Sequence, residues 1–285
     1  MKDTSLQVKQ GVQVQPKTFV VKIGGSILKS GFPEAFKADL KKLCEQNRVV
    51  LVHGGADLVT QTAQKMGLQQ KFIVSPDGMR SRYTDRETMD VYTMVMAGKI
   101  NKQIVASIQS CGIKAVGLSG ADGFLLKAVR KKKLIILDER GRKVVIEGGY
   151  TGKIESVNTE ILSSLLELNY LPVIAPIAID EEYQLLNVDS DRAAAYIAGS
   201  LKADGIIMCT DVEGVMLGET IVKKMSMEEA KKNLELIGHG MKKKVYAAIE
   251  ALTMGVGEVV ITSGLIQEPM TSAINHKAGT LLVSQ

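Results

Sequence analysis

Cysteine, histidine and tryptophan are scarce in this sequence. Its 285 residues include three cysteines, three histidines and no tryptophan, and the cysteines stand far apart at positions 44, 111 and 209. Without a CxxC pair or a cluster of cysteine and histidine, the pattern excludes a recognisable zinc motif and a disulfide framework. A chain with so few, scattered thiols is typical of a reducing cytoplasm.

Long apolar runs are missing as well. The longest, residues 171–179, is too short to cross a bilayer, and the polar residues 1–15 lack the apolar core of a signal peptide. We therefore expect a cytoplasmic protein without a membrane partner, and a flexible N-terminal extension over residues 1–16. The hydrophobic content of 45% is enough for one large or two modest domains.

A large excess of charge of one sign is also absent. The formal net charge is +5, which by itself does not indicate a nucleic-acid partner. Residues 127–143 hold eight basic and two acidic side chains, so this segment accounts for the whole excess. Apolar runs at 134–137 and 144–146, around a turn containing Gly141, predict a β-hairpin. Its lysines either protect a sheet edge from pairing or form a docking surface for an acidic partner.

Short apolar strands alternate with helical segments along the chain. The expected strands cover 18–23, 49–52, 115–118, 134–137, 144–146, 171–174, 205–209, 259–261 and 280–283. The expected helices cover 32–46, 56–66, 86–111, 156–169, 189–201, 226–236 and 242–254. Continuously apolar strands are typical of sheets buried on both faces. The pattern therefore predicts an α/β fold with a parallel or mixed sheet between helices.

Two of these strands run into a pair of glycines. The strand over 18–23 carries Lys22 and is followed by Gly24 and Gly25, while the strand over 49–52 is followed by His53, Gly54 and Gly55. Glycine N–H groups beside a lysine and before a helix suit phosphate oxygens. Ordinary strand-to-helix turns often contain glycine too, so each fragment alone leaves both interpretations open.

Polar residues gather at three further helix starts. Arg80 and Arg82 precede one of them, and a guanidinium there either binds a carboxylate or stays solvated in a loop. Asn187, Asp189 and Asp191 stand at a strand-to-helix junction, where acidic residues cap a helix or Asp191 points inward. Residues 242–244 are three lysines near a helix N-terminus, where cations oppose the helix dipole, so they favour an anionic partner or form a solvated basic turn.

No common nucleotide-binding motif explains these groups. The segment 149–154 superficially resembles a Walker loop, but Glu147 stands at the first glycine position of that motif and Ile154 at its Ser/Thr position. No GxGxxG follows a strand, which argues against a dinucleotide dehydrogenase. No GxSxG or Cys/His arrangement indicates acyl transfer.

In their order along the chain, these segments closely resemble the amino acid kinase family, in its N-acetylglutamate kinase branch. The resemblance covers residues 17–285 and rests on Lys22-Ile-Gly-Gly25, His53-Gly-Gly55, Arg82-Tyr-Thr84, Asn187-Val-Asp-Ser-Asp191, Thr210-Asp-Val-Glu-Gly214 and Gly240-Met-Lys-Lys-Lys244. Segments 81–87, 98–101, 117–123 and 148–154 resemble the kinases that act on aminoadipate or glutamate attached to an acidic carrier protein.

The resemblance implies a fold and a reaction. The fold is an αβα sandwich with an open, mainly parallel central sheet, an acceptor-binding lobe over 17–183 and a nucleotide-binding lobe over 184–285. The reaction uses ATP and Mg²⁺ to phosphorylate a side-chain carboxylate of the carrier-linked amino acid, which gives an acyl phosphate for lysine or arginine biosynthesis. A homodimer is implied as well, and no protein side chains are implied as metal ligands.

The resemblance also assigns site residues. Lys22 and Lys244 match two transition-state lysines, and Asp191 matches the acid that holds both. On the acceptor side the matching residues are Gly25, Gly54, Gly55, Arg82 and Asn187. On the nucleotide side they are Gly24, Thr210, Asp211, Val212, Gly214, Val215 and Gly238. The N–H groups of both glycines after Lys22 would face the transferring phosphoryl group.

This sequence departs from the family pattern at two places. Ala56 replaces the family's common third glycine, and Lys243 competes with Lys244, although the neighbouring residues favour Lys244.

The basic hairpin and Lys153 favour an acidic macromolecular substrate over free N-acetylglutamate. An N-acetylglutamate kinase is the nearest alternative, and a catalytically silent nucleotide sensor is a remote one. Aminoadipate and glutamate differ by one methylene, so the sequence does not choose between them.

Overall fold

The computed structural model describes residues 15–285, so most of the expected flexible extension over 1–16 lies outside the described residues. An eight-stranded sheet forms the centre, in the order β16-β18-β17-β13-β1-β2-β10-β5. Its strands are β1 (Thr18–Ile23), β2 (Arg48–His53), β5 (Ala115–Ser119), β10 (Leu171–Ala175), β13 (Gly205–Thr210), β16 (Lys224–Ser226), β17 (Glu258–Ser263) and β18 (Thr280–Val283). Every neighbouring pair is parallel except β17 and β18, which confirms the mainly parallel sheet.

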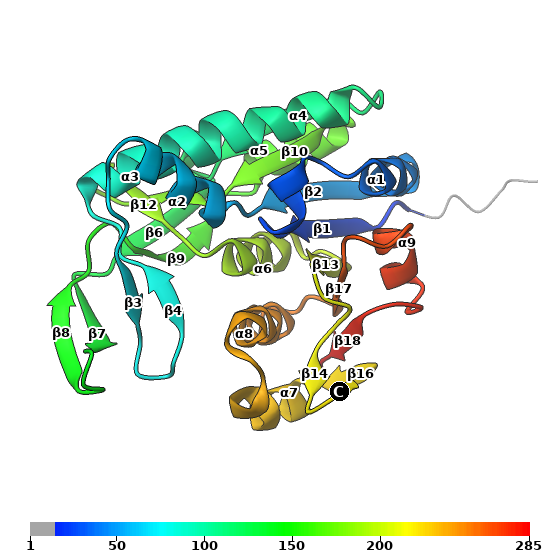
Figure 1. Ribbon diagram of the computed structural model, residues 1–285. Coiled ribbons are helices and arrows are strands. Elements are labelled where there is room, and N and C mark those ends of the chain that lie inside the picture. The colour runs from blue at the N-terminus through cyan, green and yellow to red at the C-terminus, as the bar shows by residue number, and fades with distance from the viewer. Residues whose placement is uncertain (1–14) are drawn as a thin grey trace, which may run out of the picture.

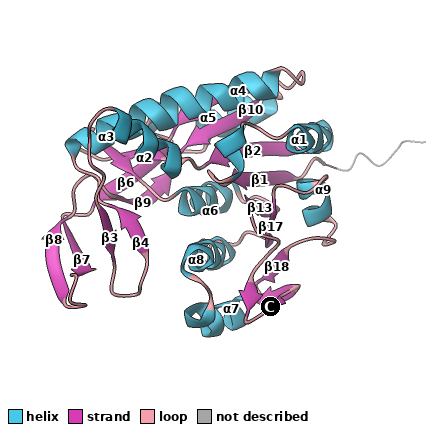
Figure 2. Cartoon of the chain, viewed as in Figure 1, coloured by secondary structure: helices cyan, strands magenta, loops and turns pink. Residues whose placement is uncertain are grey.

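Helices cover both faces of this sheet (Figure 1 and Figure 2). One layer contains α1 (Glu34–Gln46), α2 (Ala56–Lys65), α3 (Arg86–Thr93), η2 (Met94–Ile100), α4 (Asn101–Gln109) and α9 (Pro269–Ile274). The other contains α5 (Glu160–Glu167), α6 (Ser190–Leu201), α7 (Met227–Asn233) and α8 (His239–Thr253). Phe19 and Val21 of β1 point into the first core and Val20 into the second, as alternation along a strand requires. The predicted αβα sandwich is confirmed.

Smaller elements stand beside the main sheet. A four-stranded sheet has the order β12 (Leu185–Asn187), β11 (Ile177–Ile179), β6 (Leu126–Arg130) and β9 (Gly152–Val157). The two-stranded sheets are β3 (Phe72–Val74) with β4 (Arg80–Arg82), β7 (Lys133–Leu137) with β8 (Lys143–Glu147), and β14 (Met216–Leu217) with β15 (Thr220–Ile221). Short helical turns are η1 (Ile27–Ser30), η3 (Asp122–Phe124) and η4 (Leu234–Leu236).

The basic hairpin is confirmed as β7 and β8. They pair antiparallel, with Ile135 opposite Val145. Figure 1 shows this hairpin next to the β3–β4 hairpin at one end of the molecule, and β3 contacts β7. The β7–β8 hairpin therefore projects from the main body of the protein beside the β3–β4 hairpin.

Three expected helices differ from the structure, and one of them, expected over 226–236, consists of α7 and the 3-10 turn η4. The helix expected over 86–111 is divided into α3, the π-helical η2 and α4. The helix expected from residue 156 was wrong at its start, because Ser156 belongs to β9, which pairs with β6. Helix α5 begins only at Glu160, whose N–H donates to Asn158 Oδ1 at 3.1 Å. Periodicity does not fix a boundary where a short strand leads almost directly into a helix.

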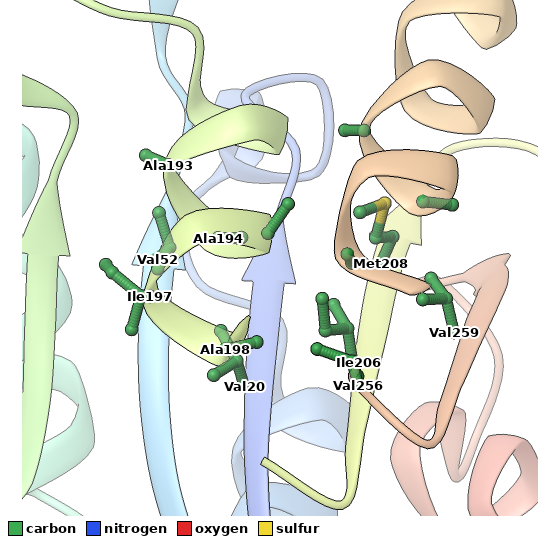
Figure 3. Close-up of a cluster of buried hydrophobic side chains, with 14 of the residues drawn as sticks. Val20, Val52, Ala193, Ala194, Ile197, Ala198, Ile206, Met208, Val256 and Val259 are labelled. Carbon is green, nitrogen blue, oxygen red and sulfur yellow. The ribbon is translucent and has the colours of Figure 1, made fainter. Parts of the chain in front are cut away.

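Helix α6 lies close against the sheet because most of its buried residues are alanines. Figure 3 shows Ala194 and Ala198 over Val20 of β1 and Val52 of β2, and all four are fully buried. Small contact residues let a helix approach its neighbours closely. The packing brings the N-terminal turn of α6, with Asp191, to the carboxyl end of β1. None of the helices in residues 15–285 is long and apolar enough to cross a membrane.

Candidate active site

Two lysines share one carboxylate at the carboxyl end of β1. Lys22 Nζ lies 2.7 Å from Asp191 Oδ1, and Lys244 Nζ lies 3.1 Å from Asp191 Oδ2. Lys22 comes from β1, Asp191 from the first turn of α6, and Lys244 from the N-terminal half of α8. The structure thus brings together all three residues predicted to be catalytic, although their roles stay predictions.

The N-terminus of α6 is held by its own side chains. Asp189 caps the helix, accepting hydrogen bonds from the backbone N–H groups of Asp191 at 2.9 Å and Arg192 at 3.1 Å. Arg192 Nε donates to Glu250 Oε2 of α8 at 2.7 Å. This ion pair joins the two helices that carry Asp191 and Lys244, so their side chains meet in a fixed geometry.

The charged cluster is buried. Only 3% of Lys22 and 5% of Asp191 is exposed. Burial opposes ionisation of Asp191, but the two ammonium groups outweigh it and hold the pKa of Asp191 below its ordinary value. Burial outweighs the ion pair at Lys22 and lowers its pKa, whereas at Lys244 the Asp191 carboxylate outweighs burial and raises the pKa. Two cations against one anion make this a favourable place for a polyanion.

The two glycine pairs lie against each other at the ends of β1 and β2. A Cβ on Gly25 would stand 2.8 Å from Gly55 N, and a Cβ on Gly54 would stand 3.0 Å from Gly25 N. Gly24 N–H donates to a carbonyl of β13 at 3.0 Å, and Gly54 N–H donates to a carbonyl of β1 at 2.9 Å. Within residues 15–285, neither Gly25 N–H nor Gly55 N–H donates to a protein acceptor. These two peptide groups are therefore the ones available to an anion.

Gly25→Ala is expected to lower the stability of the fold. Its Cβ would meet the backbone of Gly55, which cannot rotate away, so the change should cost about 1–3 kcal/mol of unfolding free energy. Gly98→Ala is the matched control, since its Cβ would meet nothing within 4 Å. Thermal unfolding measured on both variants tests this. A Gly25→Ala protein with unchanged melting temperature would contradict the close contact of the two turns.

A cavity of about 340 Å³ opens beside the glycine turns. Four of the five residues predicted to bind the acceptor line it, namely Gly54, Gly55, Arg82 and Asn187. Its wall also includes residues that the sequence did not single out for this role, among them Lys131, Arg192, Lys243, Leu134 and Ile136. The fifth predicted residue, Gly25, instead lines a second cavity of about 580 Å³ between η1, α2 and α4.

Arg82 and Asn187 are oriented by neighbouring groups. Arg82 Nη2 donates to Ala56 O at 2.7 Å and to Thr60 Oγ1 at 2.8 Å. Asn187 Nδ2 donates to Thr84 Oγ1 at 2.9 Å. The guanidinium thus lies at the N-terminus of α2, beside Ala56. Burial lowers the pKa of Arg82, which remains far above neutrality for any arginine.

The three consecutive lysines of α8 make three different contacts. Lys242 Nζ lies 2.8 Å from both carboxylate oxygens of Glu235. Lys243 Nζ donates to a backbone carbonyl of β4 at 2.5 Å and lines the 340 Å³ cavity. Lys244 alone of the three contacts Asp191. This geometry supports Lys244 over Lys243 as the lysine of the charged cluster.

The residues predicted to bind the nucleotide follow β13 and precede α8. A Cβ on Gly24 would stand 3.9 Å from Thr210 Cα, so the turn after β1 adjoins the end of β13. Val215 is buried and its N–H donates to Thr280 Oγ1 at 2.8 Å, whereas Val212 is exposed. Neither of the two cavities is lined by Gly24, Thr210, Asp211, Val212, Gly214, Val215 or Gly238. Their contacts with a nucleotide stay predictions.

The described part of the chain offers no cluster of three or more His, Cys, Asp or Glu side chains that could hold a metal ion. Both carboxylate oxygens of Asp191 are already paired with lysines. A magnesium ion at this site would therefore fit as a companion of nucleotide phosphates, which supply the oxygen ligands that it prefers.

Comparison with known proteins shows similarity over most of the chain. Residues 17–263 match the model of the amino acid kinase family. A chain of Cenarchaeum symbiosum, provisionally named as a LysW-aminoadipate/LysW-glutamate kinase, is 51% identical over 262 residues, which cover 92% of this chain and 98% of the relative. The LysW-aminoadipate/LysW-glutamate kinase of Metallosphaera sedula is 45% identical over 256 residues, 90% of this chain and 96% of the relative. The carbamate kinase of Giardia has a similar fold, with a TM-score of 0.67, 16% identity and coverage of 95% of this chain and 100% of that chain.

Proposed function

Because the chain belongs to the amino acid kinase family, we propose that it transfers the γ-phosphoryl group of ATP to the side-chain carboxylate of aminoadipate or glutamate held by an acidic carrier protein. Relatives named for this activity are 45% and 51% identical to it. The observation that carries the proposal is the buried cluster of Lys22, Asp191 and Lys244, which holds two cations against one anion.

The proposed reaction needs positioning and charge stabilisation more than proton transfer. A carboxylate oxygen of the acceptor attacks the γ-phosphorus while the bond to the bridging oxygen of ADP breaks, which gives an acyl phosphate and ADP. The acceptor carboxylate, with a pKa of about 4, is already ionised at neutral pH, so no general base is required. When it is bound with the nucleotide, Mg²⁺ neutralises phosphate charge.

Side chains and backbone N–H groups of this chain have separate roles in the proposed reaction. Lys22 and Lys244 stabilise the charge that spreads over the transferring phosphoryl oxygens, and Asp191 holds their ammonium groups in place. The N–H groups of Gly25 and Gly55 donate to the reacting oxygens. The site holds the acceptor carboxylate and the γ-phosphate of ATP next to each other before they react, which lowers the entropic part of the activation barrier.

The 340 Å³ cavity is the proposed acceptor site. Arg82 and Asn187 would hold the polar end of the amino acid, since a guanidinium and an amide both donate hydrogen bonds to a carboxylate. Leu134 and Ile136 of the basic hairpin provide apolar wall for its methylene groups. Lys131, which is also in the wall, adds positive charge at the side that faces the hairpin.

The basic hairpin β7–β8 is the proposed docking surface for the carrier. Lys132, Lys133, Arg140 and Lys143 are exposed on it or at its base, while other residues of β7 line the acceptor cavity. An acidic carrier bound there would lie next to the cavity that receives its amino acid. The exposed pair Ile135 and Val145, 55% and 61% accessible, offers apolar contact between these charges.

Charge reversal at Lys132, Lys133 and Lys143 is expected to weaken use of the carrier-linked substrate. The KM for the carrier should rise about 10–10²-fold at low salt, and this difference should shrink as salt screens the charges. Reversal of the exposed Lys231 and Lys232 on α7 is the control. If the KM and its salt dependence stay the same in the hairpin variant, the lysines only protect a sheet edge.

The choice of acceptor is tested by direct comparison. Carrier-linked aminoadipate, carrier-linked glutamate and free N-acetylglutamate are each mixed with the protein and ATP, and formation of ADP and acyl phosphate is measured. The proposal expects a carrier-linked acid to give the highest kcat/KM. Preference for free N-acetylglutamate would overturn it, and ATP binding without transfer to any of the three would indicate a nucleotide sensor.

In this proposal the enzyme acts in lysine or arginine biosynthesis, in the cytoplasm and as a homodimer. We also propose the division into an acceptor-binding lobe over 17–183 and a nucleotide-binding lobe over 184–285. Strands of both segments belong to one eight-stranded sheet, so the lobes would share a continuous core. Light scattering of the purified protein tests the dimer.

A further inference from the structure

His53, the last residue of β2, is fully buried beside the glycine turns. Its Nδ1 lies 3.0 Å from the carbonyl oxygen of Gly54, and its Nε2 lies 3.3 Å from Asn101 Nδ2. A carbonyl only accepts hydrogen bonds, so Nδ1 carries the proton. Asn101 Nδ2 also faces the Val173 carbonyl at 2.9 Å, which identifies it as the donating end of the amide, so Nε2 accepts. The ring is therefore neutral, and burial lowers its pKa to about 4.

Both polar groups of Gly54 are held in place. Its N–H donates to a carbonyl of β1 at 2.9 Å, and its C=O accepts from His53 Nδ1. In a trans peptide the C=O and the following N–H point in opposite directions, and every peptide bond described is trans. Holding the Gly54 carbonyl therefore fixes the direction of the Gly55 N–H, whose nitrogen adjoins Gly25.

The π-helical segment supports the same turn from behind. Ile100 Cδ1 and Met96 Sδ are the nearest atoms to the position that a Cβ on Gly55 would take. Asn101 begins α4 immediately after η2 and is fully buried. Interruptions of this kind in α-helices are frequent at functional sites. Here the segment brings the amide of Asn101 to His53 and packs two apolar side chains against the glycine.

We propose that neutral His53 is a positioning residue for the phosphoryl transfer described above, fixing the Gly54 carbonyl so that the Gly55 N–H points at the reacting oxygens. This inference rests on the proposed function and assigns the imidazole no proton transfer. Because the Gly55 N–H is already oriented before the substrate binds, no free energy is spent on reorienting it during the reaction. Such preoriented donors stabilise transition-state charge effectively.

Two substitutions separate positioning from packing. In His53→Asn the side-chain amide nitrogen can replace Nδ1 as the donor to Gly54, whereas His53→Leu fills space without a donor. The Leu variant should lose about 10²-fold in kcat, the loss typical of a misplaced oxyanion donor, with little change in the KM for ATP. The Asn variant should recover at least about tenfold of this loss. Equal kcat in the Leu variant and the wild type would overturn the proposal, as would equal losses in both variants.

A spectroscopic measurement does not depend on how the variants fold. In the full-length wild-type protein labelled with ¹⁵N-histidine, the His53 ring should show the neutral form protonated at Nδ1, with no titration between about pH 5.5 and 8. A ring protonated at Nε2, or a charged ring, would overturn the proposal even in a fully active enzyme. If the wild-type protein transfers no phosphoryl group to any carboxylate, the proposed function is contradicted. The position of the proton on the His53 ring can still be measured in that case, so the two failures are distinguished.

Discussion

Replacing Lys22 or Lys244 by alanine is expected to lower kcat by about 10²–10³-fold, the loss typical of one transition-state charge contact. Each ammonium would stabilise the phosphoryl group while it is transferred, so its removal should affect kcat more than the KM for ATP. The fold should persist, because the remaining lysine still neutralises Asp191. Carrier-dependent ADP release, with circular dichroism as a check of folding, measures both effects.

Neighbouring lysines provide the controls for this experiment. Lys232→Ala, at an exposed position on α7, should leave turnover unchanged. Lys243→Ala tests the choice within the lysine triplet, and its loss in kcat should be smaller than that of Lys244→Ala because Lys243 does not contact Asp191. Near wild-type turnover after removal of Lys22 or Lys244 would contradict the catalytic assignment. A larger loss in Lys243→Ala would move the role to that residue.

The layered fold could be predicted because its signals are local. Buried parallel strands read as continuous apolar runs, and amphipathic helices between them require layers on both faces. The carboxyl ends of neighbouring parallel strands meet at one edge of a sheet, so glycines that follow β1 and β2 come to lie near each other. Strands β6 and β9 cannot be recognised from the sequence because charged residues interrupt their apolar positions and because they flank the basic hairpin.

Contacts between distant segments could not be predicted from local patterns. Only the family resemblance assigns Asp191 to the same site as Lys22, since nothing in either segment specifies how α6 packs on β1. The small side chains of α6, such as Ala194 and Ala198, provide the physical reason in retrospect (Figure 3). A resemblance can thus name the residues of a site before the packing that unites them is known.

The direction in which helix side chains point explains why the sequence alone does not distinguish the three lysines of α8. Lys242, Lys243 and Lys244 look equivalent in sequence, but successive residues of an α-helix point about 100° apart. One therefore reaches Glu235, the next the β4 backbone and the third Asp191. The sequence presents His53 only as part of a motif, because the donor and acceptor roles of its ring depend on Asn101, which lies far away in the sequence.

Asp191→Asn is expected to be the most destabilising of these substitutions. It removes the only carboxylate that contacts the buried ammonium groups of Lys22 and Lys244 in the described structure. Breaking a buried ion pair by deleting one partner typically costs about 3–5 kcal/mol of unfolding free energy. The exposed pair of Lys29 and Asp57, 2.8 Å apart, provides the control, since Asp57→Asn should cost less than about 1 kcal/mol.

The pH dependence of this loss identifies its cause. Burial already lowers the pKa of Lys22 in the wild type, and loss of Asp191 should lower it further. The unfolded chain, with a lysine pKa of about 10.4, then binds more protons than the folded variant, so the stability of the variant should rise with pH. Urea unfolding should therefore show the deficit of Asp191→Asn shrinking between about pH 7 and 10. A deficit of constant size over this range would mean that Asp191 contributes through packing and hydrogen bonds, and not by neutralising the two lysines.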